Sequence, residues 1–186
     1  MDIVVLLAAM SALISAPSFS RNEKHERDPE MHQTRQGNQW YFGMKRHVGE
    51  DSWENAIHST KVTEANMHDS QMISGLLHGA EMEVWGDSAK QGQTEAIQAA
   101  ASAAQDLVHR RGSRGHRLSA QLRAKNAAKS RVRAKGEHPL PIIKRVFGFT
   151  RVRHRVSVEN ETRFRVLYAL ADLYIKRRLL TRQRNQ

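Results

Sequence analysis

Cysteine is absent from this chain of 186 residues, so the protein has no disulfide bond, no thiolate nucleophile and no zinc site of the cysteine type. The zinc-protease pattern His-Glu-x-x-His is absent as well. The ten histidines are scattered, and neither His25 with His32 nor His109 with His116 has a spacing that predicts metal ligation. We therefore expect most histidines to be ordinary surface or half-buried residues.

Long apolar runs are also scarce, and the only candidate lies at the amino terminus. Residues 3–14 are apolar except for Ser11 and are followed by Ser15-Ala16-Pro17-Ser18. The length suits the core of a signal peptide better than a membrane span, but no Lys or Arg precedes the run. The competing interpretation is a buried strand at the ragged start of a domain. No other segment could span a bilayer, so we expect no membrane association.

Acidic residues are nearly missing from residues 107–155, which hold fifteen Lys and Arg and a single carboxylate, Glu137. The rest of the chain has a slight acidic excess, although the net charge is +11. So uneven a distribution indicates a partner rather than a fold. Nucleic acid is the first choice, because its phosphates attract such a segment. An anionic membrane surface and a merely solvated basic face are the alternatives.

The periodicity of apolar residues predicts a mixed α/β fold with helices on a small sheet. Phe164, Leu167, Tyr168 and Ala171 follow helical spacing and predict a core-facing stripe. Pro139 and Pro141 should end or kink the helix before them. We predict strands at 39–48, 56–62 and 83–86, helices at 70–77, 94–108, 118–137 and 162–180, a loop at 21–37, a turn at 49–52 and an extended or mixed segment at 143–156.

Two acidic residues are candidates for metal-dependent chemistry on nucleic acid. Asp87 follows the predicted strand 83–86, and Glu137 lies in an Arg133-x3-Glu137-x6-Lys144 pattern. Carboxylates from distant parts of a chain can hold Mg²⁺ against phosphates. Each has a structural alternative: Asp87 can begin a turn, and Glu137 can pair with Arg133 on one helical face.

Several motifs together closely resemble the DDE transposases of bacterial insertion sequences, in the group named for insertion sequence five. The resemblance covers about residues 14–180 and is weak near 93–130. Its most specific stretches are Arg-Asp-Pro-Glu-Met-His-Gln-Thr at 27–34 and Gly-Asn-Gln-Trp-Tyr-Phe-Gly-Met-Lys at 37–45. It continues through His58-Ser59, the segments 63–69 and 76–79, Gly86-Asp87, Gln91-Gly92, the segments 133–139 and 142–149, Asn160 and the segment 167–173.

This resemblance implies an RNase H-like mixed sheet with flanking helices, incomplete because its first strand is degenerate. It implies that Asp87 and Glu137 are catalytic ligands of Mg²⁺ or Mn²⁺, used to cut and join DNA at the transposon's terminal inverted repeats and at a target. Arg133 and Lys144 match basic residues of the Glu signature that should contact DNA. We expect the same of the neighbouring residues Arg131, Lys135 and Arg145.

The chain departs from the family pattern at its first catalytic aspartate, where an ungapped count places Met10. Lys90, Gly136 and Pro141 also replace residues usual in the family. The family's amino-terminal DNA-binding half has no counterpart. We therefore expect a truncated, inactive copy, with a degenerate apolar start at 1–20, the truncated catalytic domain at 21–180 and a basic tail at 181–186.

Two other functions remain open at this stage. The basic segment is typical of a non-catalytic DNA-binding protein, which could form a homo-oligomer or act as a dominant-negative partner of an intact transposase. An exported cationic protein is the third hypothesis, based on the apolar run. We expect a cytoplasmic, nucleoid-associated protein.

Overall fold

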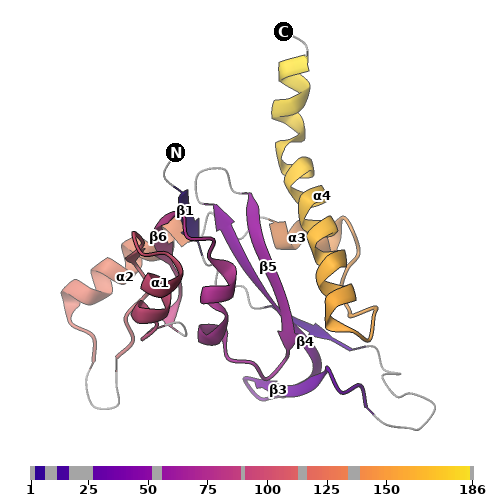
Figure 1. Ribbon diagram of the computed structural model, residues 1–186, viewed down its shortest axis with the longest axis horizontal. Helices are drawn as coiled ribbons and strands as arrows, with labels where there is room; N and C mark the ends of the chain where they lie inside the picture. The colour runs from indigo at the N-terminus through magenta and orange to yellow at the C-terminus, as the bar shows by residue number, and fades with distance from the viewer. Residues whose placement is uncertain are drawn as a thin grey trace. The chain divides into compact units, whose positions relative to one another are not determined.

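The computed structural model describes residues 3–6, 12–16, 27–51, 56–88, 91–112, 117–133 and 139–184 (Figure 1). These residues form strands and helices, so the prediction of a mixed α/β protein is confirmed. The chain divides into two compact units. The first unit comprises Met1–Ala12, His47–Lys61 and Met67–Glu137, and the second comprises Leu13–Arg46, Val62–Asn66 and His138–Gln186.

The sheet of the first unit combines parallel and antiparallel pairing. Its strands are β1 (Ile3–Leu6), β6 (Glu81–Trp85), β7 (Gln105–Asp106), the end of β4 (Gln39–Asp51) and most of β5 (Ile57–Glu64). β6 lies between β1 and β7 and is parallel to both. The other edge of β1 pairs antiparallel with β4, where Leu6 lies opposite Glu50. β1 arises from the amino-terminal apolar run, in agreement with the strand interpretation of those residues.

Short helices cover this sheet and form the core of the first unit with it. The helices are η1 (Asp69–Met72), η2 (Ser74–Leu76), α1 (Thr94–Ala100) and α2 (Ala120–Arg133). The first two are 3₁₀ helices within the predicted helix at 70–77. A cluster of buried apolar residues joins η2 and α1 to β6, and it contains Ile73, Leu76, Leu77, Val84, Ile97, Ala101, Ala104 and Val108.

The helix predicted over residues 94–108 is only half correct. α1 ends at Ala100, and Gln105 and Asp106 then pair with β6. The Ala- and Gln-rich composition favours a helix, but the exposed edge of β6 and the burial of Ala104 and Val108 outweigh that preference. Asp106 accepts a hydrogen bond of 2.6 Å from the hydroxyl of Thr94, which fixes the start of α1 to β7.

The second unit packs two helices against a group of strands. Its elements are β2 (Ala12–Ser15), β3 (His32–Gln36), the first part of β4, α3 (Pro139–Arg145) and α4 (Ser157–Arg184). Gly43 of β4 explains how closely β2 can approach. A Cβ atom at that position would collide with the carbonyl oxygen of Ile14, so only glycine fits.

The core of the second unit is built on the apolar stripe of α4, as the periodicity predicted. Phe164, Tyr168 and Ala171 are buried, and Phe149 meets Phe164 edge to face with ring centroids 4.7 Å apart. α3 packs on α4 and buries Ile143. Within the described residues, no helix combines the length and the apolar character needed to cross a bilayer.

Three local predictions are wrong. Part of the predicted loop at 21–37 is strand β3, because residues 32–36 pair antiparallel with β4 across the turn at Gly37. The predicted turn at 49–52 is strand as far as Asp51, and residues 52–55 lie outside the described residues. The predicted extended or mixed segment at 143–156 is helical at residues 143–145, because α3 extends to Arg145. Pro139 and Pro141 lie in the first turn of α3, which needs no amide donor at those positions.

Candidate functional site

Asp87 lies just beyond the carboxyl end of β6, as the sequence predicted for the strand before it. β6 is held on one side by β1 and on the other by β7, with Val84 opposite Asp106. The pairing continues past the strand, because the amide of His109 donates to the carbonyl oxygen of Gly86 over 3.0 Å. Gly86 is buried and Asp87 is partly exposed. Ligands commonly gather at the carboxyl ends of parallel strands, so the position suits a ligand of a bound ion.

The other predicted ligand, Glu137, lies outside the described residues, as do Lys135 and Met10. Arg133 is the last residue of α2, and its side chain is outside what the structure describes. Among the described residues, Asp87 belongs to no group of three side chains that could hold a metal ion. The described part of the chain therefore provides one carboxylate of the predicted Mg²⁺ or Mn²⁺ site, which is not enough to derive a catalytic step.

Helix α2 presents basic side chains to solvent from a fixed position in the first unit. The side-chain amide of Asn126 donates to the carbonyl oxygen of Arg110 over 2.8 Å and accepts from its amide over 3.2 Å. The ammonium group of Lys129 donates to the carbonyl oxygen of Val108 over 3.1 Å. Burial is the main cause that lowers the pKa of Lys129 below its usual value. The basic side chains of α2 that stay exposed are Arg123, Lys125 and Arg131.

The other predicted DNA contacts lie in the second unit. Lys144 and Arg145 form the last turn of α3 and are exposed. Cations in the last turn of a helix complement its carboxyl end, so these side chains also have a structural reason for their position. Their contact with DNA stays a prediction.

Sequence reasoning missed a cluster of two histidines and one glutamate in the first unit. His58 lies on β5, His78 lies between η2 and β6, and Glu81 begins β6. Their potential ligand atoms all lie within 4.8 Å of one another. The two histidines are twenty positions apart, which is not a spacing that predicts metal ligation. Only the juxtaposition of β5 with the segment before β6 creates it.

The carboxylate of Glu81 is buried and fixed by the backbone. Its two oxygens accept hydrogen bonds from the amides of His78, over 2.6 Å, and of Gly79, over 2.7 Å. The Nε2 atom of His58 lies 3.6 Å from Glu81 Oε1. Burial is the largest cause and lowers the pKa of His58, although an interaction with the backbone of His58 itself and the charges of Glu81 and Asp51 act in the opposite direction.

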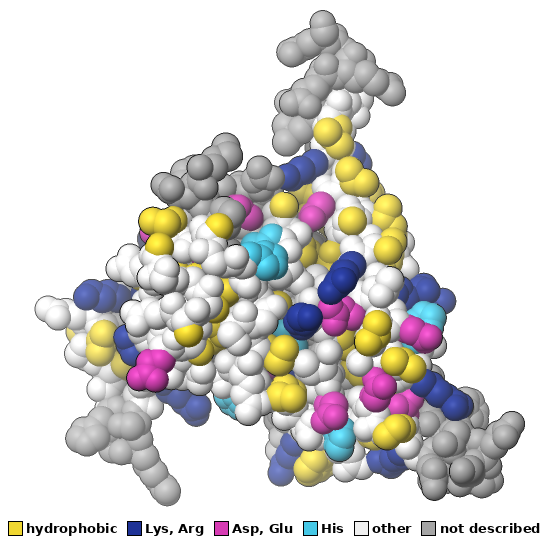
Figure 2. Space-filling view, viewed as in Figure 1, with side chains coloured by type: hydrophobic (Ala, Val, Ile, Leu, Met, Phe, Trp, Pro, Cys, Tyr) yellow, Lys and Arg dark blue, Asp and Glu magenta, His cyan; other side chains and the backbone are white. Residues whose placement is uncertain are grey.

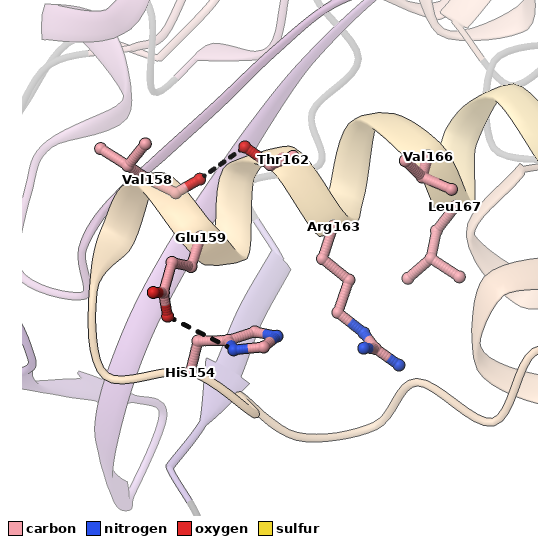
Figure 3. Close-up of a pocket in the computed structure, with 7 residues that line it drawn as sticks. All are labelled: His154, Val158, Glu159, Thr162, Arg163, Val166 and Leu167. Carbon is pink, nitrogen blue, oxygen red and sulfur yellow. Dashed lines mark hydrogen bonds and ion pairs between the residues drawn. The ribbon is translucent and has the colours of Figure 1, made fainter.

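A pocket of about 640 Å³ lies beside the first half of α4 in the second unit (Figure 3). His154 and Glu159 form an ion pair of 3.4 Å at one end of it, and both side chains are exposed. Arg163 also lines the pocket, and its guanidinium lies over the ring of Phe149. Because the acid–base pair of His154 and Glu159 is in open contact with solvent, we assign no catalysis to this pocket.

One protein-family model matches this chain. The model is described as the transposase DDE domain, and it matches residues 14–172. No solved structure matches the chain.

Proposed function

Because the chain belongs to the transposase DDE domain family, we propose that it descends from the transposase of a bacterial insertion sequence, in the group named for insertion sequence five. Its substrate class is DNA, in the form of terminal inverted repeats and a target. The family reaction is strand cleavage and strand transfer. An RNase H-like fold is part of this proposal, supported by the mixed sheet with flanking helices. Action on DNA implies a nucleoid location.

The observation that carries the proposal is the position of Asp87. It lies directly beyond the carboxyl end of β6, and β6 pairs in parallel with β1 and β7. We assign Asp87 and Glu137 as ligands of Mg²⁺ or Mn²⁺. When bound, such an ion activates the attacking oxygen and stabilises the leaving oxygen of the phosphodiester. Arg131, Arg133, Lys135, Lys144 and Arg145 are proposed to bind the DNA backbone, which their positive charge suits.

The donor set does not fit an active centre of this family. Met10 stands where the resemblance requires a first aspartate, and a thioether is a soft ligand that serves Mg²⁺ poorly. We therefore propose that the chain does not cleave DNA. The missing carboxylate is the cause, rather than a loss of DNA binding.

Restoring the carboxylate tests this explanation. Supercoiled DNA carrying the terminal repeats of an insertion sequence of this group is incubated with the full chain and Mn²⁺. We expect no nicking by the parent chain and nicking by Met10→Asp. That activity should disappear when Asp87→Asn or Glu137→Gln is added. Met82→Asp is the matched control, because it introduces a carboxylate at an exposed site on β6.

Either of two results would overturn the proposal. Nicking by the parent chain that is lost in Glu137→Ala contradicts inactivity. Failure of a folded Met10→Asp variant to nick shows that the missing aspartate is not the cause. Far-ultraviolet circular dichroism of each variant establishes that it is folded.

A second candidate function is that of a DNA-binding subunit that inhibits an intact transposase. Two surfaces favour it: the exposed basic side chains of α2, and an apolar face along α4 that Figure 2 shows in yellow. The apolar face would contact the partner, either a second copy or the intact enzyme. Its exposed side chains are Val158, Val166, Leu170, Leu173 and Leu180.

Inhibition is measured by adding the chain to a transposition reaction of an intact transposase of the same group. We expect transposition to fall as the chain is added. Leu170→Glu with Leu173→Glu should relieve the inhibition while leaving DNA binding intact. Inhibition unchanged by these substitutions would exclude α4 as the contact surface.

A further inference from the structure

The cluster of His58, His78 and Glu81 has the composition of a transition-metal site. Two imidazoles and one carboxylate are a ligand set that suits Zn²⁺ and its neighbours, whereas Mg²⁺ and Ca²⁺ prefer oxygen ligands alone. Three protein ligands leave a further coordination position for water. The side of the cluster formed by His78 is exposed, so both water and the ion can enter there.

The ring nitrogens of His58 indicate that the cluster binds an ion. Its side chain is 18 % exposed, and neither ring nitrogen has a hydrogen-bond partner among the described residues. Its distance of 3.6 Å from Glu81 is too long for a hydrogen bond. Buried polar atoms normally have partners, and leaving one without a partner is unfavourable. A metal ion bound by the ring lone pair would supply that partner.

The geometry needs little change to accept an ion. Ligands of a tetrahedral Zn²⁺ site lie about 3.3 Å apart, close to the 3.6 Å between His58 and Glu81. Glu81 is held by two backbone amides, and each carboxylate oxygen keeps a second lone pair for a metal. His78 supplies the remaining movement, because its ring is exposed and lies beside that of His58, with centroids 4.5 Å apart.

We propose that His58, His78 and Glu81 together bind one Zn²⁺-type ion, which ties the segment before β6 to β5. The two strands are joined by a connection that holds η1 and η2. An ion that binds the folded chain and not the unfolded chain stabilises the fold by mass action. It also fixes the residue at which β6 begins, six positions before Asp87. The site does not include Asp87, and its existence does not depend on DNA cleavage.

The full chain, stripped of metal with a chelator and then dialysed, is titrated with ZnCl₂, CoCl₂ or MgCl₂. Calorimetry should give one Zn²⁺ per chain. The unfolding temperature should rise by about 5–10 °C at a hundredfold excess of free Zn²⁺ over its Kd. Co²⁺ should give visible absorption bands of a four-coordinate site with nitrogen and oxygen ligands. Any effect of MgCl₂ on the unfolding temperature should be the same in the parent and in His78→Ala, because Mg²⁺ prefers oxygen ligands.

His78→Ala is the decisive variant, because His78 is exposed and its backbone amide, which holds Glu81, is kept. It should fold like the parent and weaken Zn²⁺ binding at least about a hundredfold, beyond the tenfold to hundredfold usual for loss of a supporting residue. His58→Gln and Glu81→Gln should weaken binding as well. His32→Ala is the matched control, since His32 pairs with Glu64 at 3.4 Å on the surface and, among the described residues, belongs to no group of three potential metal ligands.

Three outcomes would overturn the proposal. The parent chain could show no Zn²⁺-dependent rise in unfolding temperature. The folded His78→Ala variant could bind Zn²⁺ as tightly as the parent, which would assign the binding to other histidines. His32→Ala could weaken binding as much as His78→Ala does, with the same conclusion.

Discussion

The side-chain amide of Asn160, in the first turn of α4, donates a hydrogen bond of 2.7 Å to the backbone carbonyl oxygen of His154, in the loop before the helix. The same amide donates to the carbonyl oxygen of Val156 over 2.9 Å and lies 3.5 Å from the sulfur of Met44. Its oxygen accepts from the amide of His154. Asn160 is fully buried, and its side chain forms the hydrogen bonds that backbone groups of the loop before α4 would otherwise form with water.

Asn160→Ala should lower the free energy of unfolding by about 2–4 kcal/mol, because the carbonyl oxygen and the amide of His154 both lose their partner. Asn160→Asp should cost more at neutral pH, since a carboxylate would face the carbonyl oxygens of His154 and Val156. Urea unfolding followed by circular dichroism measures both. Thr162→Ala, on the exposed side of α4, should change stability by less than about 0.5 kcal/mol. Equal stability of Asn160→Ala and the parent would show that the capping hydrogen bonds contribute nothing.

The hydroxyl of Ser59 occupies the space beside the Cα atom of Gly49. A Cβ atom on residue 49 would collide with the Ser59 hydroxyl, which donates to the carbonyl oxygen of Leu76 over 2.8 Å. Gly49→Ala should cost about 1–3 kcal/mol from overpacking. Ser59→Ala removes the obstacle, since the Ser59 Cβ atom is 3.7 Å away. The double variant should therefore be no less stable than Ser59→Ala alone.

A double-mutant cycle in urea measures this coupling. Gly75→Ala is the matched control, because nothing lies nearer than 3.8 Å to a Cβ atom there. Additive effects of Gly49→Ala and Ser59→Ala would contradict the predicted contact.

Elements with a strong local pattern were predictable from the sequence. The stripe of Phe164, Leu167 and Tyr168 specifies α4, because a helix that buries one face needs apolar residues at that spacing. Asp87 could be located after a strand for the same kind of reason, since β6 ends in Val84-Trp85 and is followed by Gly86. In both cases, neighbouring residues carry the information.

Features that depend on distant residues could not be predicted. β7 follows an Ala-rich segment that favours a helix, and only pairing with β6 makes Gln105 and Asp106 extended. The meeting of His58 with Glu81 depends in the same way on how β5 and β6 are placed. A scattered set of histidines gives no warning of it, because metal ligands need proximity in space and not in the sequence.

Arg46 is a buried charge stacked on two aromatic rings of α4. Its guanidinium lies 5.3 Å from the centroid of Phe164 and 5.8 Å from that of Tyr168, and the side chain is 2 % exposed. Burial lowers the pKa of Arg46. Arg46→Met should be at least as stable as the parent, because methionine fills the same space without a desolvated charge.

Arg46→Ala should lose about 2–3 kcal/mol, because the aliphatic stem of the side chain no longer packs. Chemical unfolding of the two variants separates packing from charge. Arg165→Met, on an exposed position of α4, is the control for removing a positive charge. A large loss of stability in Arg46→Met would show that the contact of the cation with the rings outweighs its desolvation.

The basic face of α2 makes a prediction about salt dependence. Arg123, Lys125 and Arg131 are exposed, while Asn126 and Lys129 hold the helix in the first unit. Removing one side chain that binds a phosphate should reduce the slope of log K against log salt concentration by about 0.9 on duplex DNA. Changing all three exposed residues to Gln should thus reduce the slope by about 2–3 and weaken binding equally on unrelated sequences.

Gel-shift titrations at several salt concentrations measure the slope on two unrelated duplexes. Arg35→Gln is the control for loss of one exposed positive charge, because Arg35 lies on β3, outside residues 107–155. The slope for Arg35→Gln should equal the slope for the parent, apart from a small effect of the lower net charge. An unchanged slope in the triple variant would exclude α2 as a DNA-binding surface, because released counterions report phosphate neutralisation directly. A loss of affinity confined to one of the two duplexes would instead indicate that these side chains read bases, which phosphate binding alone cannot do.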